Sequence, residues 1–369
     1  MVDPLGGLTL RAWVVAVVLL VALCATGCTD MAYLAQSANG HIKIMQAARP
    51  VDDWLADDGT PPTLKQRLQL AQQIRRYASN DLLLPDNASY RRYAQLPRRA
   101  VVWNVVAAPP YSLTLKTWCF PVTGCIGYRG YFDEQDAQAQ ATALREEGLE
   151  ASVYGVPAYS TLGWTNWLGG DPLLSTFIHY PQGELARMIF HELSHQVLYV
   201  KDDTAFNESF ATAVERMGSS AWLAGQAGTA AQSEYAAFDA RRRAFRALTA
   251  DTRKKLLAIY ATDSSVPLPA DPQETRKTAA YAEFRQAYAQ LRQQWGGYAG
   301  YDLWVANANN AAFGALAAYD DWVGAFEALF RQEHGDWAAF YAAAQRLAEL
   351  PRGERTARLQ QLKAMDNGL

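Results

Sequence analysis

The chain has 369 residues, of which 50% are hydrophobic and 19% are charged, and its formal net charge is −3. This length is enough for a sizeable hydrophobic core in one or two domains. The near-neutral charge provides no basic surface for nucleic acids or anionic lipids, so we expect no nucleic-acid partner.

Residues 1–27 have the features of a bacterial export signal. Arg11 precedes an apolar run at residues 12–23, which is too short for a membrane span because a spanning helix needs about 20 apolar residues. Residues 25–28, Ala-Thr-Gly-Cys, resemble a lipobox, in which the cysteine carries lipid. The resemblance implies a membrane anchor at Cys28 and, with Thr29 after it, an outer-membrane lipoprotein facing the periplasm of a Gram-negative bacterium. An ordinary cleaved signal with an incidental cysteine is the alternative.

The segment 28–100 is expected to be an N-terminal helical region. One helix is predicted over residues 31–48 and another over 62–79, where Pro62 suits the first turn. A short third helix near Tyr90 is an option. The apolar stripe of the second helix recurs every three or four positions, at Leu64, Leu68, Ala71, Ile74 and Tyr77.

Strand signals begin in the next region, 101–260, which we expect to be catalytic. Alternating or β-branched runs predict strands over residues 101–106, 113–118 and 151–156. A helix is predicted over residues 133–147, with Asp133 as its cap and Gly148 just past its end.

The cysteines suit an oxidising compartment. Cys24 leaves with the signal and Cys28 carries lipid, so Cys119 and Cys125 remain as a pair. Proline and glycine between them allow a tight turn, and we expect a disulfide. A second metal site at these thiols has no nearby partners in the sequence.

Residues 191–195 read His-Glu-Leu-Ser-His on a predicted helix. Positions four apart share a helix face, so His191 and His195 can reach one divalent cation. Glu192 then lies beside that ion, where a carboxylate can accept a proton from activated water. A solvated His-Glu pair is the alternative. The apolar face on the same helix opposes it, because buried imidazoles are costly unless they bind something. That face comprises Ala186, Ile189, Phe190, Leu193 and Val197.

Glu208 is the expected third ligand, which leaves one position open for water as in catalytic zinc sites. Two nitrogen donors and one oxygen donor suit Zn²⁺, although manganese or cobalt could substitute. Glu215, seven residues later on the same helical face, is either a partner that orients a histidine or a solvated carboxylate. Asp202, Asp203 and His179 are weaker candidates as ligands.

The same residues resemble a known group of enzymes. HExxH followed by Asn-Glu-x-Phe-Ala at residues 207–211 resembles the gluzincin metallopeptidases, whose third zinc ligand is a glutamate on the following helix. The gap of twelve residues between His195 and Glu208 is shorter than in gluzincin aminopeptidases, and Ser209 replaces their glycine. The chain is more similar to proteobacterial lipoproteins described as predicted aminopeptidases. That resemblance spans most of the chain and includes residues 118–121, 125, 128–132, 159–164, 171–176 and 309–311.

This resemblance implies an α+β, mostly helical, zincin-like fold with a small mixed sheet beside the active-site helix. The segment 274–369 is expected to be a helical C-terminal lobe, with helices over residues 274–295, 307–329 and 336–350. Tyr298, Tyr301 and Tyr319 are candidates for stabilising an oxyanion from that lobe.

The leading expectation is a zinc-dependent peptidase acting on peptide substrates, an aminopeptidase by resemblance, with Glu192 as general base. An envelope endopeptidase and a peptidoglycan amidase are enzymatic alternatives. From another class, a non-catalytic lipoprotein could use the same scaffold for binding. The intact Glu192 counts against that alternative, because a binding site needs no base.

Overall fold

The computed structural model describes residues 32–120, 124–163, 166, 169–226, 228–261, 272–317 and 321–366. The chain divides into two units, Met1–Ala47 and Ala48–Leu369. In the first unit, the described residues 32–47 are helical. Cys28 and the predicted signal lie outside the described residues.

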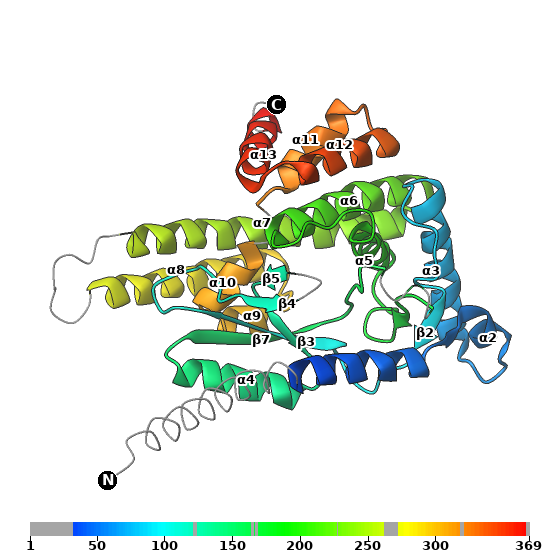
Figure 1. The fold of residues 1–369 in the computed structure, drawn as a ribbon, viewed down its shortest axis with the longest axis horizontal. Coiled ribbons are helices and arrows are strands. Elements are labelled where there is room, and N and C mark those ends of the chain that lie inside the picture. Colours follow the sequence, from blue (N-terminus) through cyan, green and yellow to red (C-terminus); the bar gives the residue numbers. More distant parts are fainter. Residues whose placement is uncertain are drawn as a thin grey trace, which may run out of the picture. The chain divides into compact units, whose positions relative to one another are not determined.

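Helices dominate the second unit, and small sheets lie among them (Figure 1). The strands are β1 (Arg49–Pro50), β2 (Arg92–Ala94), β3 (Val102–Ala108), β4 (Trp118–Phe120), β5 (Gly124–Ile126), β6 (Arg129–Tyr131), β7 (Glu150–Val156) and β8 (Leu173–Leu174). The helices are α2 (Val51–Ala56), α3 (Pro62–Asn80), α4 (Glu134–Glu146), α5 (Gln182–Ser194), α6 (Thr204–Gln226), α7 (Thr229–Tyr260), α8 (Pro272–Gln294), α9 (Asp302–Ala306), α10 (Asn310–Ala317), α11 (Val323–Gln332), α12 (Trp337–Glu349) and α13 (Arg352–Asp366). This architecture is α+β and mostly helical, as expected.

The largest sheet is antiparallel, with strand order β6-β3-β7. Six of the seven residues of its central strand, β3, are buried. In Figure 1, α4 lies on one side of this sheet and α10 on the other, and both pack against β3 and β7. Among the described strands, β7 pairs with β3 alone, and at its start Asn309 donates to the carbonyl of Ala151 and accepts from the hydroxyl of Ser152.

Two smaller sheets complete the β structure. In the order β1-β2-β8, β1 pairs antiparallel with β2 and β2 pairs parallel with β8, so this sheet is mixed. The hairpin β4-β5 aligns Cys119 with Cys125, and a disulfide joins them.

Two arginines of α3 hold two loop segments, the one that leads to α5 and the one that leads to β2. Arg67 donates from Nε to the carbonyl of Ile178 at 2.8 Å and also contacts the carbonyl of Tyr180, just before α5 begins. Arg75 is 2% exposed and donates to the carbonyls of Ser89 and Pro85 at 3.0 and 2.7 Å. Buried guanidinium groups are tolerated when such acceptors surround them.

Helices α3, α6 and α7 pack against α5. α6 packs along α5 and against α11, which in turn packs against α13. α7 packs against α8, and their aromatic core includes Phe245, Phe284, Trp304 and Phe313. None of the helices in the described part of the chain is both long and apolar enough to cross a membrane.

Local signals predicted several elements well. The expected helices over 62–79 and 133–147 correspond to α3 and α4, and the strands over 101–106 and 151–156 correspond to β3 and β7. Asp133 caps α4, since its carboxylate accepts a hydrogen bond from the backbone N–H of Gln135 at 2.7 Å. Gly148 follows the helix with φ 84°.

Three predicted elements are wrong. Residue 90 lies in a turn, because Tyr90 has φ 65° and its N–H donates to the carbonyl of Asp171 at 2.7 Å. Residues 113–117 form no regular strand; the N–H of Lys116 donates to Ala107 at the end of β3. The helix expected over 307–329 is divided into α10 and α11. At the last break, the hydroxyl of Ser209 accepts from the N–H of Trp322, which fixes the start of α11.

Candidate metal centre

The apolar face of α5 places the two histidines of the motif. Four residues of that predicted face, Ala186, Ile189, Phe190 and Leu193, are completely buried, so the helix cannot rotate without exposing them. α5 ends at Ser194, before Val197 of the predicted apolar face, because the N–H of Gln196 bonds three residues back to the carbonyl of Leu193.

Helical geometry nevertheless extends to the second histidine. His195 is the C-cap of α5 with φ −62° and ψ −17°. It therefore lies one turn beyond His191 on the same face. The two ring Nε2 atoms are 3.3 Å apart.

Asn207 fixes the connection that brings Glu208 to these histidines. Its side chain both donates to the carbonyl of Val200 and accepts from the N–H of Val200, each at 2.7 Å. Asn207 is 1% exposed, so water does not compete for these bonds. This pair of bonds joins the segment after α5 to the first turn of α6, where Glu208 is the next residue.

Three donor atoms converge from α5 and α6. Glu208 Oε2 lies 3.3 Å from His191 Nε2 and 3.7 Å from His195 Nε2. The three side chains are 7% to 13% exposed. Among the described residues, His191, His195 and Glu208 form a group that could hold a metal ion.

The spacing of these donors fits a single small cation. Ligands at about 2.1 Å in a tetrahedral arrangement stand about 3.4 Å from one another. The donor separations of 3.3, 3.3 and 3.7 Å are close to that value. Two imidazoles and one carboxylate are also the donor types that zinc accepts.

Protonation differs between the two histidines. Burial lowers the pKa of His195 to about 4, despite the opposing charge of Glu208, so the ring is neutral at pH 7. Burial also lowers the pKa of His191, but hydrogen bonds to Glu208 and Glu215 outweigh it and raise the pKa to about 10. A histidine must be deprotonated to bind a metal, so a cation that binds at this site would displace the proton of His191.

Glu215 connects His191 to a buried ionic network. Its Oε2 lies 2.9 Å from His191 Nδ1, and its Oε1 contacts a guanidinium nitrogen of Arg187. Arg187 Nε lies 3.2 Å from Glu184, which also contacts Arg242 of α7. Glu215 is 2% exposed, so the alternative that it is a solvated carboxylate is wrong.

Glu192 is buried next to the triad and is 8% exposed. Burial raises its pKa to about 7, although the charge of His191 opposes the rise. A carboxyl group with a pKa near 7 can both accept and return a proton at neutral pH. The backbone carbonyl of Glu192 accepts a hydrogen bond from Ser160 at 3.4 Å.

Three tyrosines near the centre were missed by the sequence analysis. Burial raises the pKa of Tyr154 and of Tyr199 to about 12, and the charge of Glu208 contributes to both increases. Burial, then the charge of Glu192, raises the pKa of Tyr90 well above its ordinary value. The hydroxyl of Tyr90 is buried without a partner among the described residues. Tyr199 follows His195 by four residues, whereas no spacing rule links Tyr90 and Tyr154 to the motif, because the turn at 90, β7 and α5 meet only in the fold.

The other candidate ligands and the candidate oxyanion-stabilising tyrosines lie outside the triad. His179 is exposed. Asp202 accepts from the N–H of Cys125 at 2.5 Å, and Asp203 pairs with Arg355 at 2.7 Å, so both carboxylates have structural partners. Among the oxyanion candidates, Tyr298 and Tyr301 line a cavity beside the N-terminal half of α5, and Tyr319 lies outside the described residues.

The fold and the triad define a mostly helical α+β protein with a candidate site for one metal ion. A family model described as "Putative aminopeptidase" matches residues 32–359, and the chain belongs to this family. Membership of this family supports the assignment of the protein as a peptidase. No curated protein and no solved structure matches the chain.

Proposed function

We propose that the protein is a zinc-dependent peptidase, specifically an aminopeptidase, with His191, His195 and Glu208 as ligands and Glu192 as general base. The observation that carries the proposal is the convergence of three donor atoms at 3.3 to 3.7 Å beside a buried carboxyl group. A purely structural zinc site has four protein ligands, whereas this group offers three among the described residues.

A zinc ion bound at these donors would supply Lewis acidity, which makes water a stronger acid and a peptide carbonyl a better electrophile. Glu192 then accepts the proton of the attacking water and returns it to the leaving amine. Glu215 holds the ring of His191 through Nδ1, which leaves Nε2 on the side of His195 and Glu208, where it would bind the ion.

The edge of β7 that has no partner among the described strands supports a peptide as substrate. Four consecutive residues of β7, from Ser152 to Gly155, line a groove of about 1530 Å³. Successive strand residues point to opposite faces of a sheet, so the groove follows the edge of the strand. An extended peptide can pair with such an edge as an additional strand. Tyr154, whose pKa responds to Glu208, connects this groove to the metal centre.

Metal analysis combined with a substrate panel tests the proposal. The protein should contain one zinc per chain and hydrolyse aminoacyl substrates with free N-termini. Glu192→Gln should keep the zinc but lower kcat by about 10²- to 10⁴-fold, because only the proton acceptor is lost. Glu146→Gln, an exposed carboxylate on α4, is the matched control and should change neither quantity.

Other outcomes separate the alternatives. Cleavage of N-blocked peptides would indicate an endopeptidase. Zinc binding without turnover on any substrate would favour a non-catalytic binding protein and contradict the proposal.

A further inference from the structure

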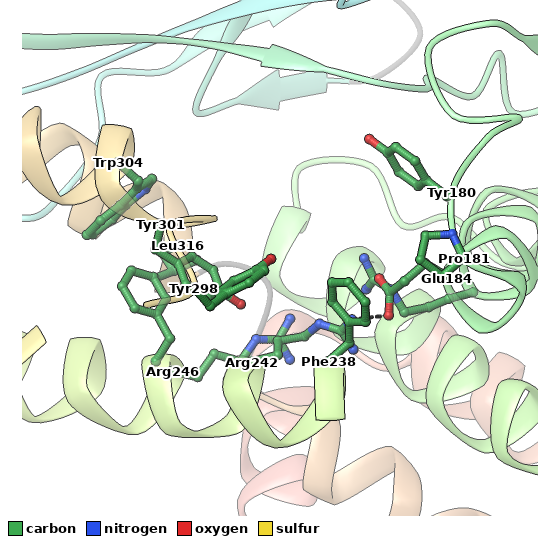
Figure 2. A pocket seen from close by; sticks show the side chains of 12 residues that line it. Tyr180, Pro181, Glu184, Phe238, Arg242, Arg246, Tyr298, Tyr301, Trp304 and Leu316 are labelled. Atoms are coloured by element: carbon green, nitrogen blue, oxygen red, sulfur yellow. Dashed lines mark hydrogen bonds and ion pairs between the residues drawn. The ribbon is translucent and has the colours of Figure 1, made fainter. Parts of the chain in front are cut away.

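A cavity of about 460 Å³ extends along α5, on the N-terminal side of the metal centre. Residues of α9 and the preceding turn lie on one side of it and Tyr180 and Pro181 on the other, while Phe238 and Arg242 of α7 lie along its floor (Figure 2). Half of its twelve lining residues are aromatic: Tyr180, Phe238, Phe245, Tyr298, Tyr301 and Trp304. A concave aromatic lining of this size is typical of a ligand site rather than of ordinary surface.

Ring contacts make the cavity wall rigid. Phe245 and Tyr301 are stacked with ring centroids 4.0 Å apart, and Trp304 meets Phe245 edge-on at 5.3 Å. Phe238 and Tyr298 meet edge-on at 6.0 Å. All of these rings except Phe245 are only partly buried, so they present apolar surface to the cavity.

The cavity and the metal centre lie one helical turn apart along α5. Glu184 and Arg187 line the cavity, and His191 lies one turn after Arg187, about 5.4 Å along the helix. Glu215 contacts both Arg187 and His191. A substrate residue next to the scissile bond can therefore reach the cavity, because an extended chain advances about 3.3 Å per residue.

Charges in the lining favour an uncharged side chain. Glu184 already pairs with Arg187 and Arg242, so a charged substrate group would have to compete with these contacts. A cationic side chain would also be repelled by the net positive charge of the lining, which contains three arginines and one glutamate. Among uncharged side chains, an aromatic ring should bind most tightly in this cavity, because it buries the largest apolar area and can make edge-to-face contacts with the lining rings.

We infer that this cavity receives an aromatic side chain of the peptide substrate, next to the scissile bond. The inference rests on the proposed peptidase function and gives it a substrate class.

Paired substrates test the inference. In the unmodified protein, kcat/KM should be higher for a phenylalanyl substrate than for alanyl, lysyl or glutamyl substrates. Phe238→Ala and Tyr298→Ala should each lower kcat/KM for the phenylalanyl substrate by about tenfold. The alanyl substrate should change by no more than about twofold, since it does not fill the cavity. Leu257→Ala, an exposed apolar residue on α7 outside the cavity, should change neither value.

A binding measurement separates failure of this inference from failure of the proposed function. Titration calorimetry on the Glu192→Gln protein should show tighter binding of Phe-Ala than of Ala-Ala, and Phe238→Ala should remove the difference. Equal losses on both substrates, or no aromatic preference in the unmodified protein, would overturn the inference while hydrolysis itself stands. Should no substrate be hydrolysed, equal affinity for the two dipeptides would overturn the inference as well, whereas a preference for Phe-Ala would support it.

Discussion

Glu215 sets the orientation of His191, because its Oε2 is the acceptor for the ring nitrogen that faces away from Glu208. Such acceptors fix the tautomer of a metal-binding histidine. His195 contacts a carboxylate through Nε2, at Glu208, and no carboxylate contact with its Nδ1 is found in the described part of the chain. The orientation of the centre therefore depends mainly on one carboxylate.

Replacing that carboxylate should weaken zinc binding. Glu215→Gln keeps the shape but loses the charge that faces both His191 and Arg187. The zinc dissociation constant should rise by about 10- to 100-fold. Competition with a chromogenic chelator measures this, and Glu215→Asp should recover part of the loss. Unchanged zinc affinity in the Gln variant would show that Glu215 only packs.

Asp171 makes the stability of the fold depend on pH. Burial raises the pKa of this carboxyl group from 3.8 to about 6, and two hydrogen bonds from Thr161 only partly oppose the rise. Between these two values the folded state holds a proton that the unfolded state releases. The contribution of this group to the free energy of unfolding is therefore fully present below about pH 4 and is lost as the pH rises through about 6.

Asp171→Asn should remove this dependence, because an amide does not titrate. The free energy of unfolding of the variant, relative to the unmodified protein, should increase by about 2 kcal/mol from pH 4 to pH 7. Urea denaturation in the presence of a chelator at several pH values measures the difference. A difference that stays constant over this range would contradict the assigned role of burial.

At the level of elements, the connection between α5 and α6 determines whether the third ligand reaches the histidines. Asn207→Ala removes both hydrogen bonds to Val200. We expect a loss of about 2 kcal/mol in the free energy of unfolding, because each buried bond contributes about 1 kcal/mol. Zinc affinity should fall as well, since Glu208 follows directly.

The control for this prediction is Asn80→Ala, an exposed asparagine at the end of α3. Thermal unfolding and zinc titration on both variants test it. Equal behaviour of the two alanine variants would mean that the bonds of Asn207 do not position α6.

Elements with local signals could be predicted from sequence, and elements that depend on tertiary contacts could not. The amphipathic period of α3 and the cap of α4 are local. Residues 113–117 alternate like a strand, yet they lack a ladder of partners, and alternation cannot report that absence. The early end of α5 depends on bonds within its last turn, which the apolar pattern does not encode.

The candidate site shows the same division. The spacing of His191 and His195 and the following Asn-Glu pair were enough to predict the triad that the fold brings together. Tyr90 and Tyr154 could not be predicted as neighbours of this site. They come from a turn and a strand far from the motif in sequence, and only long-range packing brings them near it.

For the molecule as a whole, the expected lipid anchor predicts where the protein resides. Cys28→Ala should move the protein from the membrane fraction to the soluble periplasmic fraction, because the acyl chains are lost. Fractionation of cells that express each form, followed by immunoblotting, tests this. Retention of the variant in membranes would contradict lipidation at Cys28 as the anchor.

The central claim is that one cation binds between α5 and α6. Anomalous diffraction at the zinc edge, on crystals of the purified protein, tests it most directly. The account predicts a single zinc peak about 2.0 to 2.2 Å from Nε2 of His191, Nε2 of His195 and a carboxylate oxygen of Glu208. Crystals grown with zinc that show no peak at this position, or a Glu208 side chain turned away from both histidines, would contradict it.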